Sequence, residues 1–190
     1  GLKIFDYRIN EINGGSIEIF CSKKTSKIKI KKKIINNLLK DEQKIDSKAY
    51  NNFNDRIKKV KELFNMFINL KSNKKIIGYG ASTKGNVVLN HCEVNNRKIK
   101  EICDGSKKKI SKFTPGSNIK IISKQNMRKK KPDYLVVLIW SFRKEVIKQE
   151  IDYLKSGGNL IFLLPRFHLI NIKNYKYFLK QTFDSLSYNY

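Results

Sequence analysis

The chain has 190 residues, with 41 Lys and Arg against 16 Asp and Glu, and a formal net charge of +25. Its hydrophobic fraction of 40% is enough to form a core, which excludes a disordered tail and a disulfide-rich miniprotein. Its apolar runs fall short of the roughly 18 residues of a membrane span, and residues 1–10 lack the pattern of a secretory signal. The three cysteines form no CxxC pair, so we expect free thiols and no metal site in these residues.

The positive charge comes mainly from lysine. The chain contains 35 Lys but 6 Arg, and Lys, Ile and Asn together make 81 of 190 residues. These three amino acids have A/T-rich codons, so an A/T-rich genome raises all of them whatever the protein does. Proteins that read bases favour Arg, whose planar group pairs bidentately with guanine. The composition therefore argues against a nucleic-acid partner. The alternative interpretation is a functional polybasic surface.

The first third of the chain predicts a hairpin followed by a long helix. Residues 3–9 and 16–22 alternate like strands around Asn13-Gly14-Gly15, a tight-turn signal. The basic residues 23–33 are interpreted as a solvated connector. Residues 46–70 are typical of an amphipathic helix, because apolar residues recur at intervals of three and four and form one stripe. Because the chain begins with Gly in the middle of a strand pattern, we expect it to be a piece of a longer protein.

From residue 74 onward, short apolar segments alternate with helical patterns. Strands are expected at residues 74–80, 99–104, 118–123, 133–140 and 159–165, and helices at 83–92 and 141–158. The second helix is expected to begin at the N-cap Ser141 and to end at Gly157. The predicted fold is α/β, a Rossmann-like, mostly parallel sheet flanked by helices and preceded by the hairpin and the long helix. Residues 167–190 show no strong periodicity.

Residues 78–86, Gly-Tyr-Gly-Ala-Ser-Thr-Lys-Gly-Asn, lie at an expected strand-to-helix turn. Backbone N–H groups at the start of a helix favour an anion, and glycines allow a ligand to approach. The segment is not a Walker A loop, because Asn86 stands where Lys is required, and Thr83 replaces the third glycine of the dinucleotide fingerprint. Asp104 ends the next strand, where a ribose-binding acid lies in such folds. A glycine-rich turn without a ligand is the alternative.

Several motifs occur in an order that resembles a known family. They are residues 78–86, Thr-Pro-Gly at 114–116, Lys-Pro-Asp-Tyr at 131–134, Trp140, and Gly-Gly at 157–158. Together they resemble the C-terminal domain of the S-adenosylmethionine-dependent C-methyltransferases that act on nucleotide-linked keto-deoxysugars. Ile4-Phe5-Asp6 and residues 13–16 resemble the strand pair that ends the family's methyltransferase domain. The resemblance covers residues 1–166.

The resemblance implies a division of the chain into four parts. Residues 1–30 are the β segment from the end of a methyltransferase domain, 31–72 the connector and amphipathic helix, 73–166 the Rossmann-like domain, and 167–190 a tail. It also implies a cytoplasmic enzyme in which a zinc-binding domain and an S-adenosylmethionine-binding domain precede these residues. This chain then holds neither zinc nor the methyl donor, and is inactive alone.

The resemblance further implies that one cleft holds the nucleotide sugar. The residues expected to bind this substrate are Gly78, Tyr79, Gly80, Ser82, Lys84, Asn86 and Asp104. A lysine ammonium suits a diphosphate as a point charge. Lys84 is therefore the first candidate for that contact, and Lys107, Lys108 and Lys109 are further candidates. The alternative function is a non-enzymatic Rossmann-like module that binds nucleotide or nucleic acid through a basic surface.

The resemblance also implies a catalytic residue in the hairpin turn. The reaction removes a proton next to the sugar ketone, and the enolate then takes a methyl group from the sulfonium. Many family members have His before Gly-Gly-Ser, where this chain has Asn13, whose amide cannot titrate. Three interpretations stay open: another residue is the base, Asn13 orients the sugar, or the reaction has changed. His91 and His168, the two histidines, are interpreted as surface or packing residues.

Overall fold

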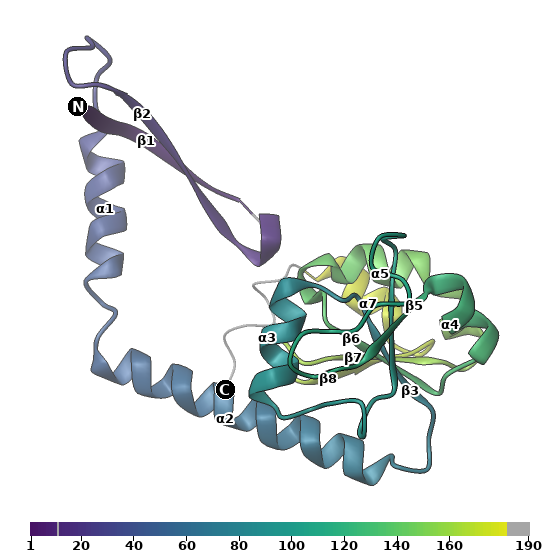
Figure 1. The fold of residues 1–190 in the computed structure, drawn as a ribbon. Coiled ribbons are helices and arrows are strands. Elements are labelled where there is room, and N and C mark those ends of the chain that lie inside the picture. The colour runs from purple at the N-terminus through teal and green to yellow at the C-terminus, as the bar shows by residue number, and fades with distance from the viewer. Residues whose placement is uncertain (11, 182–190) are drawn as a thin grey trace. The chain divides into compact units, whose positions relative to one another are not determined.

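The computed structural model of the chain describes residues 1–10 and 12–181. The chain divides into two compact units, residues 1–57 and residues 58–190, and the division falls inside the long helix α2 (Ser47–Leu70). The first unit contains a two-stranded sheet and the second a six-stranded sheet (Figure 1). None of the helices in the described residues is long and apolar enough to cross a membrane.

The first unit begins with the predicted hairpin. Strands β1 (Leu2–Asn10) and β2 (Ser16–Lys23) pair antiparallel around the 3-10 turn η1 (Ile12–Gly14). The basic segment that follows is only partly a connector, because helix α1 (Lys32–Glu42) begins within it. Lys31 ties this segment to β1: its N–H donates to the backbone oxygen of Phe5, and its Nζ lies 2.6 Å from Asp6 Oδ2.

One face of the hairpin is apolar and exposed. The cross-strand pairs Ile9–Ile17, Tyr7–Ile19 and Ile4–Cys21 share that face, since paired residues of neighbouring strands point to the same side. Ile9 is 64% exposed and Ile19 is 53% exposed. Two strands alone are marginally stable in water, so a hairpin of this kind depends on packing against something else.

The second unit is built on the predicted parallel sheet. Its strands are β3 (Ile76–Tyr79), β4 (Glu101–Asp104), β5 (Lys120–Ser123), β6 (Tyr134–Val137), β7 (Asn159–Phe162) and β8 (His168–Ile170). They lie in the order β5-β4-β3-β6-β7-β8, and every pair is parallel except β7 with β8. The predicted α/β fold class is thereby confirmed. Strand β8 lies in the segment for which no element was predicted.

Helices cover both faces of this sheet (Figure 1). They are α3 (Thr83–His91), α4 (Lys124–Lys130), α5 (Arg143–Gln149), α6 (Ile151–Lys155) and α7 (Tyr175–Lys180), together with the second half of α2. On one face, Ile77 and Tyr79 pack with residues of α4, α5, α6 and α7. On the other, Val136 and Leu138 pack with Phe64 of α2 and with residues of α3. The buried positions of α2 confirm the predicted amphipathic helix.

The region after β6 differs from the prediction. A 3-10 turn η2 (Trp140–Phe142) comes first, closed by a bond from the Phe142 N–H to the Ile139 oxygen, and α5 begins only at Arg143. The prediction of Ser141 as an N-cap is therefore wrong. The predicted single helix is also wrong, because Glu150 leaves helical geometry (φ −111°, ψ 27°) and separates α5 from α6.

Candidate functional site

The topology places a potential ligand site at the carboxyl end of β3. The chain runs from β3 to β4 and β5 on one side of the sheet and then returns to β6 on the other side. In open α/β sheets, ligands bind outside the carboxyl ends of the strands at such a switch point. The residues that follow β3 and β6 therefore form the two walls of the candidate site.

The glycine segment 78–86 lies at this switch point, and its glycines are required by close packing. Gly80 has φ +89°, and a Cβ there would lie 2.6 Å from Ile139 Cγ2 in the segment after β6. A Cβ on Gly85 would lie 2.8 Å from Leu138 Cβ, so this glycine lets the first turn of α3 approach β6. The two glycines hold the loop and the helix close to the neighbouring strand end.

Ser82 acts as the N-cap of α3. Its Oγ accepts a hydrogen bond from the Gly85 N–H at 2.9 Å and lies 3.3 Å from the backbone oxygen of Leu138, to which it donates. Lys84 lies in the exposed first turn of this helix. The Asn86 side chain is half-buried, and its Oδ1 has no hydrogen-bond partner among the described residues. Ser82, Lys84 and Asn86 are thus brought together at the start of one helix.

The side chain of Tyr79 points away from these residues, into the core. It is fully buried, and its hydroxyl donates to Glu150 Oε1 at 2.9 Å. Burial, reinforced by the nearby Glu150 carboxylate, raises the pKa of the Tyr79 phenol well above its usual range. The Lys124 ammonium lies 4.7 Å from the centre of the Tyr79 ring. Only the backbone of Tyr79 belongs to the loop at the sheet edge.

Asp104 ends β4 beside the glycine loop, and both of its carboxylate oxygens accept hydrogen bonds from the protein. Oδ2 accepts from the Ala81 N–H at 2.9 Å, and Oδ1 accepts from the Ser106 N–H at 2.8 Å. Lys109 Nζ lies 3.4 Å from Oδ2 and donates to the Ala81 oxygen at 2.8 Å. Asp104 and Lys109 therefore hold the loop after β3 against the end of β4.

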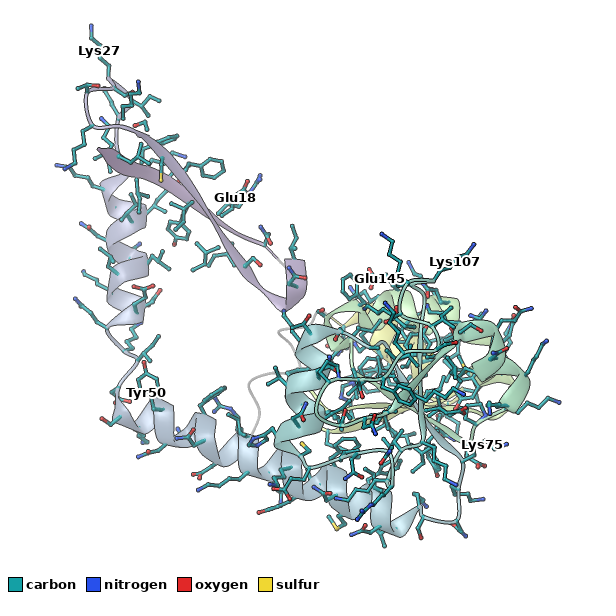
Figure 2. All side chains as sticks on the ribbon, viewed as in Figure 1. Glu18, Lys27, Tyr50, Lys75, Lys107 and Glu145 are labelled. Atoms are coloured by element: carbon teal, nitrogen blue, oxygen red, sulfur yellow. The ribbon has the colours of Figure 1, made fainter. Side chains whose placement is uncertain are left out.

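Lys107 and Lys108 are exposed in the loop after β4, at the same carboxyl edge of the sheet. Figure 2 shows Lys107 and Lys75 at opposite ends of the second unit, which distinguishes this edge from the amino edge.

The Thr-Pro-Gly turn is joined to α3, because Asn90 Nδ2 donates to the Pro115 oxygen at 3.1 Å. Gly116 has φ +74°, the left-handed value expected of the glycine in a type II turn.

The remaining candidates lie outside residues 78–86 in the sequence. Asn13 belongs to the first unit, in the turn η1, with a left-handed φ of 57° that Asn tolerates better than most residues. His168 is stacked between Phe162 and Phe178, at ring-centre distances of 5.2 and 4.9 Å, and burial lowers its pKa to about 4. His91 ends α3 on the surface.

The second wall of the site, residues 138–142, was not recognised from the sequence as part of it. This segment contacts the loop through Leu138 and Ile139, and it carries the half-buried Trp140 and the exposed Phe142. The available signal was the adjacency of the first and fourth strands in a Rossmann-like order, which brings the ends of both strands together. Within residues 1–10 and 12–181, no three His, Cys, Asp or Glu residues are grouped closely enough to hold a metal ion.

The sequence is similar to known proteins. The sequence model of a family described as "C-methyltransferase C-terminal domain" matches residues 11–165. Among curated proteins, the C-methyltransferase NovU of Streptomyces niveus is 27% identical over 178 residues, which make up 92% of this chain and 42% of that protein. The chain therefore spans less than half the length of this relative.

Proposed function

The chain belongs to the C-methyltransferase C-terminal domain family, and from this we propose that it is the nucleotide-sugar-binding part of an S-adenosylmethionine-dependent C-methyltransferase. The observation that carries the proposal is the position of residues 78–86 at the switch point of the sheet. The proposed substrate is a nucleotide-linked keto-deoxysugar, and the proposed location of the enzyme is the cytoplasm.

The proposed role of the second unit is to bind the diphosphate of the substrate. The first turn of α3 directs backbone N–H groups toward the carboxyl edge, where a negative charge is stabilised. Lys84 lies in that turn, and Lys107 and Lys108 are exposed on the neighbouring loop at the same edge. The rigid attachment of the loop by Asp104 and Lys109 supports this role, because a fixed loop loses little conformational freedom on binding.

The methyl donor is proposed to bind upstream of this chain. In Rossmann-like sites an acid at the end of the second strand holds a ribose, but both oxygens of Asp104 are occupied by Ala81, Ser106 and Lys109. The glycine loop therefore fits a diphosphate better than the donor. When bound, S-adenosylmethionine supplies an electrophilic methyl group. A zinc-binding domain is likewise proposed to lie upstream, and the chain alone to be inactive.

The hairpin of the first unit is proposed to be the last strand pair of the donor-binding domain. Its exposed face of Ile4, Ile9, Ile17 and Ile19 supports this, since an apolar sheet face is stable only when it is covered. The match covers 42% of NovU, so that relative is long enough to contain such a domain as well. Asn13 lies in the turn of this hairpin, and the proposed role for its amide is to orient the sugar while another residue removes the proton.

Calorimetric titration of the 190-residue chain tests the proposal. We expect dTDP-glucose or GDP-mannose to bind and S-adenosylmethionine not to bind. Lys84→Gln should weaken nucleotide-sugar binding by about tenfold, the loss of one charge-assisted contact. Lys148→Gln removes an exposed charge from α5 and is the matched control, expected to leave affinity unchanged. Tight donor binding by this chain, or equal effects of both variants, would contradict the proposal.

A further inference from the structure

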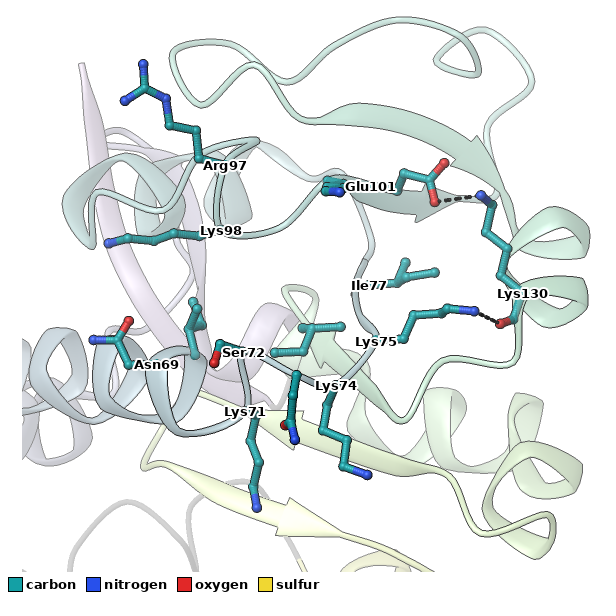
Figure 3. A pocket seen from close by; sticks show the side chains of 14 residues that line it. Asn69, Lys71, Ser72, Lys74, Lys75, Ile77, Arg97, Lys98, Glu101 and Lys130 are labelled. Carbon is teal, nitrogen blue, oxygen red and sulfur yellow. Dashed lines mark hydrogen bonds and ion pairs between the residues drawn. The ribbon is translucent and has the colours of Figure 1, made fainter.

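A cavity of about 680 Å³ opens at the amino edge of the large sheet, where β3 and β4 begin (Figure 3). Its lining comes from the end of α2, the turn after it, the loop before β4 and the end of α4. Three isoleucines belong to the lining: Ile68 and Ile77 are buried, at 5% and 2% exposed, and Ile76 is partly exposed. Pockets for organic ligands have volumes of roughly 300–1,000 Å³. The cavity therefore has the size of a ligand site, at the opposite end of the sheet from the glycine loop.

The lining of this cavity is strongly basic. Seven of its 14 residues are Lys or Arg, whereas Glu101 is its one acidic residue. In the whole chain, 41 of 190 residues are Lys or Arg. A bias toward lysine codons spreads lysine over the whole sequence and does not by itself concentrate cations more than twofold around one cavity.

Three of the seven cations have partners in the protein. Lys75 Nζ donates to the Lys130 oxygen at 2.9 Å, at the end of α4, and Lys130 Nζ lies 3.1 Å from Glu101 Oε2 (Figure 3). Lys98 Nζ donates to Asn65 Oδ1 at 2.7 Å. A cation beside the carbonyls at a helix end, as Lys75 is here, stabilises the fold, and the other two have polar side-chain partners. These three residues are therefore explained without a ligand.

The other four cations have no such explanation. Across residues 1–10 and 12–181, the side chains of Lys71, Lys74, Arg97 and Lys100 make neither a hydrogen bond nor an ion pair. Lys71 and Lys74 lie on the turn after α2, and Arg97 and Lys100 lie on the loop before β4. All four are at the rim of the cavity, and Figure 3 shows the charged ends of Lys71, Lys74 and Arg97 directed outward from it. Lysine and arginine side chains are long and flexible, so a bound anion can draw these charged ends inward.

We propose that this cavity binds a small organic anion with at least two phosphate groups, of the size of a nucleoside diphosphate. The two cation pairs suit separate phosphate groups, since a lysine ammonium binds phosphate as a mobile point charge. Ile76, which is partly exposed, offers apolar surface to the organic part of the ligand. A concave site of this size favours a small anion over a nucleic-acid duplex. This site is separate from the diphosphate site that we propose at the glycine loop.

Two triple variants with the same net charge test this site. The cavity variant carries Lys71→Gln, Lys74→Gln and Lys100→Gln. The control variant carries Lys148→Gln, Lys173→Gln and Lys176→Gln, three exposed lysines of the same unit outside the cavity. Inorganic pyrophosphate and ADP are titrated calorimetrically into each full chain. We expect the cavity variant to lose about tenfold or more in affinity and the control to stay within about twofold.

Amine footprinting of the unmodified chain gives a readout that does not depend on how the variants fold. Pyrophosphate should slow the acetylation of Lys71, Lys74 and Lys100 and leave Lys148, Lys173 and Lys176 unchanged. Equal loss of affinity in both triple variants would overturn the proposal in favour of bulk charge. Protection confined to Lys84 and its neighbours would assign the anion to the glycine loop. Binding of random DNA without binding of pyrophosphate would likewise overturn it.

Discussion

The buried carboxylate beneath the glycine loop is expected to control the stability of the second unit. Glu150 is 1% exposed, and its Oε1 accepts hydrogen bonds from the Tyr79 hydroxyl at 2.9 Å and from Arg128 Nη2 at 2.7 Å. Its Oε2 accepts from Arg128 Nε at 3.1 Å. The fork-shaped guanidinium thus compensates both oxygens of the carboxylate. Arg128→Met removes this compensation and leaves the carboxylate buried.

The cost of this substitution follows from the burial of the two partners. Removing one member of a fully buried ion pair costs about 3–5 kcal/mol, because the other charge stays in the protein interior. The Arg128 side chain is 51% exposed, so water screens one side of the pair. We therefore expect a loss of about 2–3 kcal/mol in the free energy of unfolding, or about 5–10 °C in Tm.

Urea unfolding followed by tryptophan fluorescence measures this loss, because the single tryptophan, Trp140, lies in the second unit. Lys129→Met removes an exposed charge from the same helix and should change stability by less than about 0.5 kcal/mol. Adding Glu150→Gln to Arg128→Met should recover part of the loss, since no unpaired charge is then buried. Equal stabilities of the Arg128 and Lys129 variants, or additive effects in the double variant, would refute this reasoning.

Two further predictions concern the stability of the second unit. Gly80→Ala should lower the free energy of unfolding by about 2–3 kcal/mol, because the new Cβ meets Ile139 and the φ of +89° is left-handed; tolerance of Ala in the same urea assay would refute the close approach. His168 has a folded-state pKa of about 4 against an ordinary 6.5, so the unfolded chain binds the extra proton between these values. Its contribution is complete above pH 6.5 and falls by about 3 kcal/mol toward pH 4. His168→Phe should flatten that part of the pH–stability profile, and an unchanged slope would contradict the assignment.

Hydrophobic periodicity and turn residues predicted the hairpin and the long helix well. The alternation in the hairpin and the stripe in α2 are properties of neighbouring residues, and the structure has both. Helix α4 was missed because its seven residues contain a single buried apolar side chain, Met127, and one residue makes no stripe. Its boundaries are set by local bonds instead: Ser123 Oγ accepts from the Asn126 N–H, and Lys131 ends the helix with a left-handed φ of 44°.

The break between α5 and α6 could not be predicted from local sequence. Glu150 is neither Gly nor Pro, and the apolar period continues across it. Its carboxylate is bonded to Tyr79, 71 positions away in the sequence, and to Arg128, 22 positions away. A contact between residues this far apart cannot be detected from the hydrophobic pattern of a single helix.

Asp104 and the lysines show the same limit for the candidate site. Spacing predicted that Asp104 would end the second strand of the sheet, and it does. A carboxylate at that position can accept from a ribose or from backbone N–H groups, and spacing is identical in both cases. The choice depends on where Ala81 and Lys109 lie in space, and here they occupy the carboxylate.

Composition likewise counts lysines without distinguishing their roles. Lys75 donates to a carbonyl at a helix end, whereas Lys100 has no partner in the described residues. Function therefore resides in the subset of polar groups that the fold leaves unsatisfied, and only the hydrogen-bond inventory of the folded chain identifies that subset.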